Sequence, residues 1–317
     1  MRRQAWRERL KEFLFPVETT DWLFALRLGL GLQIILYSVS LHADWDRLFA
    51  STGVGLVSRD LSEAILDVQS PLVPRIGWLV TAGSNLGFEE QTILSVSWAA
   101  LLCSGLLLLL GFFSRPAAIL AWLIHLCAVN SGGLLSYGMD NFTTIGLFYM
   151  MWSPLPDRYS LDWWRRRRPL KNPQLVGFCR RVLQFHLCLI YFFGGLAKCI
   201  GPGWWDGTSL WRALTRPPFD IIAPETLVLW KALLPFLGIS VCILETGYPI
   251  FIWLKKTRRI WFLSILAMHI SIALTMGMYL FALIMIILNV AAFGPGFAFL
   301  RKAADSSPEL FGTIDRV

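Results

Sequence analysis

Eight apolar runs, separated by polar or charged stretches, constrain this chain more than any other feature. They lie at residues 23–41, 93–112, 117–135, 142–152, 182–199, 232–254, 261–276 and 279–299. An α-helix rises about 1.5 Å per residue, so most of these runs can cross a hydrocarbon core of about 30 Å. The fourth run is short and needs residues 137–141 or Ser153 to complete a crossing, which leaves seven spans as an alternative. We therefore expect an all-α integral membrane protein with about eight transmembrane helices in one bundle.

Composition agrees with a membrane location. Hydrophobic residues make up 56% of the 317 positions and charged residues only 16%, against roughly 25% charged residues in soluble domains. No internal repeat, low-complexity segment or linker divides the chain, so we expect one domain over residues 1–317. The basic first 21 residues lead into a full-length span without a small-residue cleavage site, so the first span is expected to anchor the protein as well as target it.

The basic residues predict the orientation of the bundle. Of the 29 lysines and arginines, 21 lie in segments on the side of the N-terminus and five on the opposite side. Lysine and arginine are retained in the cytoplasm, so both termini are expected to be cytoplasmic, in a bacterial inner membrane. Removing the fourth span would place the N-terminal basic cluster and the "RRRRPLK" segment on opposite sides and weaken this bias, which favours eight spans.

The net charge of +8 lies in short loops beside the spans and not on one folded face. We therefore expect contact with membrane lipid and no nucleic-acid partner. The six cysteines form no C-x-x-C pair and are interpreted as small apolar residues: Cys103, Cys127, Cys179, Cys188, Cys199 and Cys242. Two hydrophilic stretches, residues 42–92 and 201–227, face the non-cytoplasmic side, where short helices such as residues 61–68 are expected to cover the mouth of the bundle.

Ionisable side chains inside the spans are few because each costs about 2.5–3.5 kcal/mol at a helix centre. Histidines apart, they are Arg27, Lys198, Lys231 and Glu245. Arg27 and Lys231 lie close enough to a boundary to extend toward the head groups. Glu245 lies near the middle of the sixth run and is expected to face the bundle interior.

A polar layer is predicted near the membrane midplane. Its members are His125, His186, Glu245, His269 and Asn289. They could form a hydrogen-bonded core, a proton relay or the wall of a polar cavity, and Glu245 is expected within reach of His269 or His186. The alternative is that each side chain bonds a nearby carbonyl and only holds helices together. A metal site is disfavoured because the histidines come from three helices without i, i+4 pairs.

Lys198 is placed in a separate layer, about two turns outward of the midplane. Glycines at 194 and 195 permit close helix approach, "GPG" at 201–203 ends the helix, and "WWDG" follows at once. This pattern predicts a lysine held at the end of a helix, just before a sharp turn. Its neighbours Tyr191, Trp204, Trp205 and Asp206 are expected to form a site for an apolar ring. A partly desolvated lysine can serve as a base. A lysine that only extends to the head groups is the alternative.

The segment "YFFGGLAKCIGPGWWDGTSL" resembles the signature of the vitamin K-dependent gamma-carboxylase-like membrane domain, also called the horizontally transferred transmembrane (HTTM) domain. "ETGYPIFIW" at 245–253, "MHISIALTMGMYLFALIMIILNV" at 268–290 and, more loosely, "TGVGL" at 52–56 extend the resemblance. The resemblance implies that Lys198 is the base that deprotonates a quinol on the non-cytoplasmic side. This chain has Ala197 before that lysine and Phe142 after Asn141, where the animal carboxylase has a second lysine and a histidine, and it lacks the large luminal region.

Three functions remain open from the sequence. The first is a quinol- or lipid-directed redox enzyme with Lys198 as its base and without protein carboxylation. The second is a non-enzymatic membrane protein that binds lipid, an exported peptide or another partner. The third, a small-solute transporter, is disfavoured because no inverted repeat is present. The sequence identifies neither the cofactor nor a protein partner, and a quinol is the ligand that the resemblance implies.

Overall fold

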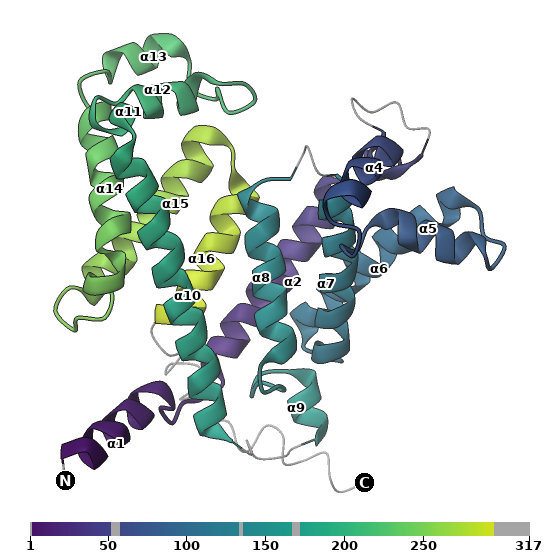
Figure 1. Ribbon diagram of the computed structural model, residues 1–317, viewed down its shortest axis with the longest axis horizontal. Coiled ribbons are helices and arrows are strands. Elements are labelled where there is room, and N and C mark those ends of the chain that lie inside the picture. Colours follow the sequence, from purple (N-terminus) through teal and green to yellow (C-terminus); the bar gives the residue numbers. More distant parts are fainter. Residues whose placement is uncertain (1, 52–57, 133–135, 167–171, 295–317) are drawn as a thin grey trace, which may run out of the picture.

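The computed structural model describes residues 2–51, 58–132, 136–166 and 172–294, and within these ranges every regular element is helical (Figure 1). The helices that hold the eight apolar runs are α2 (Asp21–Ser40), α6 (Glu90–Leu110), α7 (Ser114–Ser131), α8 (Gly138–Trp152), α10 (Pro173–Ile200), α14 (Leu234–Phe251), α15 (Arg258–Met276) and α16 (Tyr279–Phe293). The ends of two predicted runs, residues 133–135 and 295–299, lie outside the described ranges.

Five of these helices are long and apolar enough to cross a membrane: α2, α6, α10, α14 and α15. Helix α16 is apolar but has only 15 residues, and α8 also has 15. The prediction of an all-helical protein with several membrane-spanning helices is confirmed. The protein is an integral membrane protein.

Short helices gather at the two ends of the bundle (Figure 1). At one end lie α3 (Trp45–Phe49), α4 (Arg59–Gln69), α5 (Ile76–Ser84), α11 (Pro202–Trp205), α12 (Thr208–Thr215) and α13 (Pro224–Leu229). At the other end lie α1 (Arg2–Leu14) and α9 (Leu161–Arg166). The helix predicted at residues 61–68 is confirmed within α4, whose Ser58 cap accepts a hydrogen bond from the Leu61 amide.

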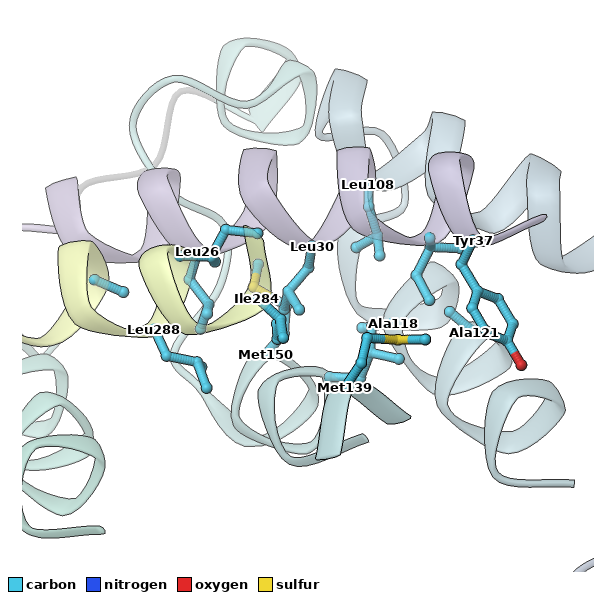
Figure 2. Packing of buried hydrophobic residues seen from close by; sticks show 14 of the residues in the cluster. Leu26, Leu30, Tyr37, Leu108, Ala118, Ala121, Met139, Met150, Ile284 and Leu288 are labelled. Atoms are coloured by element: carbon cyan, nitrogen blue, oxygen red, sulfur yellow. The ribbon is translucent and has the colours of Figure 1, made fainter. Parts of the chain in front are cut away.

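Helix α2 organises the apolar core. Its Leu26, Leu30 and Tyr37 point toward side chains of α6, α7, α8 and α16, including Leu108 and Ile284, as Figure 2 shows. Close packing with α6 depends on two glycines. A methyl group on Gly31 would lie 2.7 Å from the Leu109 nitrogen, and one on Gly105 would lie 3.0 Å from Ile34. Small residues at such crossings let membrane helices gain van der Waals contact, which replaces the missing hydrophobic driving force in lipid.

Arg27 does not extend to the head groups, and that prediction is wrong. Its side chain is 1% exposed, and its Nε lies 2.6 Å from a carboxylate oxygen of Asp157, which is fully buried. One Nη donates to the carbonyls of Leu108 and Leu109 in the last turn of α6, where backbone carbonyls run short of helical partners. A guanidinium has five donors in a planar fork, so it can neutralise a carboxylate and cap a helix end at once.

Candidate functional site

Lys198 on α10 and Glu245 on α14 form an ion pair, with 2.6 Å between Nζ and Oε2. The Glu245 side chain is 9% exposed and the Lys198 side chain 26%. The expectation that Glu245 faces the interior is met, while the prediction that Lys198 belongs to a separate layer is wrong. Lysine side chains on a helix point back toward its N-terminus, so the amine of Lys198 reaches about one turn inward. It lies 3.5 Å from the Gly194 carbonyl.

The glycine pair at 194 and 195 sets the distance between the two helices. A methyl group on Gly195 would lie 2.6 Å from the Thr246 nitrogen and 2.8 Å from Cβ of Glu245. Gly194 has room, because its nearest neighbour would be the Glu245 carboxylate at 3.4 Å. Close approach at Gly195 therefore brings Glu245 within reach of Lys198.

The turn after α10 places Trp204 beside the pair. The Lys198 amine lies 5.5 Å from the centre of the Trp204 ring, within the range of a cation–π contact. The carbonyl of Trp204 is against Gly238 of α14, where a side chain would collide with it. Gly207 adopts a φ of 82°, a left-handed conformation that favours glycine, and starts α12. The "GPGWWDG" segment therefore folds against α14 and brings Trp204 beside Lys198.

Trp205 and Asp206 are engaged elsewhere in the turn. The indole N–H of Trp205 donates to the Cys199 carbonyl. The Asp206 carboxylate accepts from the amide and the hydroxyl of Thr208, and these bonds hold its pKa below the usual range. Within the described structure both side chains shape the turn, and neither bonds Lys198. Their predicted role in substrate binding stays a prediction.

A second set of polar side chains lies next to the ion pair. The Tyr191 hydroxyl lies 2.7 Å from Nε2 of His269, and Asn289 donates to the same hydroxyl over 2.7 Å. Tyr248 donates to the Asn289 side-chain oxygen over 2.8 Å. Tyr191 lies about two turns before Lys198 on α10, and Tyr248 lies three residues after Glu245 on α14, so the network adjoins the ion pair. This Tyr191 network joins α10, α14, α15 and α16.

The donors and acceptors of the network assign its protons. Asn289 uses both amide hydrogens, toward Tyr191 and the Met285 carbonyl. The Tyr191 oxygen therefore accepts from Asn289, and its own hydrogen is available for Nε2 of His269. A neutral His269 then carries its proton on Nδ1, a buried atom without a partner among the described residues. The network can thus relay a proton to His269 only if that imidazole becomes charged.

The other predicted midplane residues belong to separate groups. His186 lies 2.9 Å from the Tyr149 hydroxyl of α8. His125 pairs with Thr144 at 3.1 Å, and its other nitrogen is 3.9 Å from Asp140. The described hydrogen bond of Glu245 goes to Lys198 and to neither His186 nor His269. No group of three His, Cys, Asp or Glu side chains in the described ranges is arranged to hold a metal ion.

Sequence reasoning did not identify Tyr248, although it lies three residues after Glu245. Residues three apart share a helix face, so a polar residue at 248 was a usable signal for the interior. Asp157 was also missed, because it follows the fourth run in a segment that the pattern assigned to a loop. The "TGVGL" segment at 52–56 lies outside the described residues.

The fold and this polar interior define a multi-pass helical membrane protein with a charge pair between two of its helices. A sequence profile of the HTTM domain matches residues 85–295, which include α6 to α16 and every site residue above. The chain belongs to the HTTM domain family. No curated protein and no solved structure shows a significant match to it.

Proposed function

We propose that this HTTM-family protein binds a quinol or a related lipid-soluble hydroxyl compound and that the Lys198–Glu245 pair takes up its proton. The observation that carries the proposal is the ion pair itself. A carboxylate and an ammonium are held 2.6 Å apart between α10 and α14, with a quarter of the lysine side chain still exposed. Charges at this depth are costly, and they mark functional positions in membrane helices.

The pair has a definite capacity for protons. As an ammonium and a carboxylate it is neutral overall and accepts one proton, after which it is an ammonium and a carboxylic acid. The O–H bond of the bound hydroxyl breaks, its electron pair stays on the ligand oxygen, and the proton goes to the pair. Proton transfer inside the pair lets the amine of Lys198 be the atom that receives it. The ammonium then stabilises the ligand anion electrostatically.

The surroundings suit a flat aromatic ligand. The Trp204 ring lies beside the amine, and 26% of the lysine side chain is exposed there. Aromatic walls bind a ring by buried area, while one polar group sets its orientation. The residues present therefore fit a quinol ring with its hydroxyl at Lys198.

A titration with a menaquinone analogue tests the proposal. Binding of the analogue should quench the tryptophan fluorescence of the purified full-length protein. Lys198→Ala should weaken this binding about tenfold or more. Lys231→Ala, which removes an exposed lysine near the outer start of α14, is the matched control. Equal affinity in both variants would reject the site.

A second measurement separates an enzyme from a binding protein. A reduced analogue whose anion absorbs at a separate wavelength should deprotonate on the wild-type protein at a pH where it stays neutral in buffer. Lys198→Arg should bind the ring but lose this signal, because guanidinium does not give up its proton in proteins. Tight binding by the wild type without deprotonation would favour the non-enzymatic function, a lipid- or partner-binding protein.

For the membrane arrangement we propose eight crossing helices in one domain, with both termini in the cytoplasm of a bacterial cell. Support comes from the helices that hold the eight runs and from the gathering of α1 and α9 at the end opposite α4, α5 and α11–α13 (Figure 1). The basic segments flank the end that carries α1 and α9, as the positive-inside rule requires of a cytoplasmic face. Lys198 then faces the non-cytoplasmic side.

A further inference from the structure

A cavity of about 690 Å³ lies near the start of α10, at the end of the bundle opposite Lys198. Its charged wall consists of Arg180, Arg181, Arg258, Arg259 and Glu18. Its apolar wall is formed by Trp253, Phe262, Leu263 and Phe293. Arg181 and Lys198 are 17 residues apart on one helix, or roughly 25 Å, so this arginine cavity is distinct from the ion pair.

Positive charge in the cavity is only partly neutralised. Glu18 pairs with Arg180 at 2.7 Å, and the other nitrogens of Arg180 donate to the carbonyls of Ala292 and Gly294. Arg181 has no carboxylate partner among the described residues. It donates to the Phe13 carbonyl and to Gln184.

The two arginines of α15 add to the excess. Arg258 uses two nitrogens on the carbonyls of Ile252 and Trp253, and Arg259 has no described partner. The first turn of α15, which begins at Arg258, holds no acidic residue, so its helix dipole adds positive potential. In the described part of the chain, four guanidinium groups therefore face one carboxylate, that of Glu18, which is bonded to Arg180.

Arg181 is held in place by packing. Its guanidinium lies 4.7 Å from the Phe13 ring centre and 5.0 Å from that of Trp253. Rings on its faces leave the edge of the guanidinium for hydrogen bonds in its plane, which is the geometry that phosphate oxygens accept. A preorganised donor of this kind binds an anion without losing much side-chain entropy.

We propose that the arginine cavity binds a phosphate group, carried by an anionic lipid head group or by a soluble phosphate compound. The free donors of Arg181, Arg258 and Arg259 match the several acceptor oxygens of a phosphate. The apolar wall of Phe262, Leu263 and Phe293 continues from the charged wall, as an acyl chain attached to that phosphate requires. The volume lies within the roughly 300–1,000 Å³ of small-molecule sites.

The "KKTRR" segment offers a matched pair of variants for the test. Arg258→Gln/Arg259→Gln removes two charges inside the cavity, and Lys255→Gln/Lys256→Gln removes two charges from the adjoining turn outside it. Native mass spectrometry of the full chain should show phosphatidylglycerol bound about tenfold more tightly than phosphatidylcholine with the same acyl chains. The arginine variant should lose about tenfold or more in affinity, the loss expected from a single charge-assisted hydrogen bond, and the lysine variant should not.

Soluble probes distinguish the two sources of phosphate. If glycerol 3-phosphate or inorganic phosphate binds as tightly as phosphatidylglycerol, with the same dependence on the arginines, the site is for a soluble compound. If only phosphatidylglycerol binds, the source is a lipid. Equal losses in both double variants would overturn the proposal, because general surface charge would explain the binding. So would an absence of phosphate binding in every form.

Arg258 also holds two backbone carbonyls, so its loss can loosen the turn before α15. Arg259→Gln alone repeats the comparison with a side chain that has no described partner, and Lys256→Gln is its control. The single arginine variant should weaken phosphatidylglycerol binding several-fold at unchanged thermal stability. Unchanged binding in this variant would also count against the cavity.

Discussion

Lys198 and Glu245 differ in exposure, and this difference predicts an unequal response to mutation. Lys198→Met leaves a carboxylate with 9% exposure, which must lie unpaired in an apolar site or take up a proton. Breaking a buried pair costs about 3–5 kcal/mol. Glu245→Leu leaves an ammonium that is 26% exposed and touches Trp204, so this variant should lose less stability.

The double variant Lys198→Met/Glu245→Leu should recover most of the stability lost by Lys198→Met alone, because neither charge then lies unpaired. Thermal unfolding of all three variants in one detergent measures this. Additive losses in the double variant would mean that the two groups do not stabilise each other. Proton uptake should be absent from the double variant even where its stability is restored.

Residue chemistry also explains why the sequence predicted wrongly that Arg27 extends to the head groups. Position in the run placed it near a boundary, where long cationic side chains extend to water. The structure instead buries it against Asp157 and the end of α6. A sequence shows the depth of a residue along its own helix, but not whether a carboxylate from a segment 130 residues away lies beside it.

At the scale of elements, the packing of α10 on α14 depends on one glycine of the pair. Gly195→Ala would force its methyl group to 2.6 Å from the Thr246 backbone, so the helices must separate or shift, at a cost of about 1–3 kcal/mol. Gly194→Ala meets nothing closer than 3.4 Å and should leave stability unchanged or slightly raised.

The two glycine variants differ by one position, so they control for each other in thermal unfolding. Gly195→Ala should also lower the affinity for the menaquinone analogue at Lys198, because Glu245 moves away with α14. Equal stability of both alanine variants would show that α10 and α14 pack less closely at Gly195 than the 2.6 Å from an added methyl group to the Thr246 nitrogen implies.

The elements themselves followed from the sequence because a backbone in lipid must bond within its own segment. Apolar length therefore predicts a helix at each run, including the short run that became α8. The contacts between helices did not follow. The Lys198–Glu245 pair depends on which faces of α10 and α14 meet and on the lysine side chain reaching one turn inward. The predicted polar layer placed His125, His186 and Glu245 together from their depth along each helix, whereas in the structure they belong to separate hydrogen-bonded groups.

At the scale of the whole molecule, the opposite ends of α10 hold the two candidate sites, and orientation decides which compartment each faces. The arginine cavity lies at the start of this helix and Lys198 at its end. In the proposed orientation, the arginine cavity lies at the cytoplasmic surface and Lys198 faces the other side. A phosphate site and a proton-accepting site would thus serve different leaflets.

Single-cysteine labelling of a variant without the six native cysteines tests this orientation. An impermeant thiol reagent applied to intact cells should label Val68→Cys and Asp220→Cys, which lie on α4 and between α12 and α13. Arg165→Cys on α9 and Lys256→Cys before α15 should react only after the membrane is opened. All four positions are exposed, so accessibility within the folded protein is not limiting. Labelling of positions 165 and 220 from the same side would remove the eight-span arrangement, and Lys198 would then face the same compartment as the arginines.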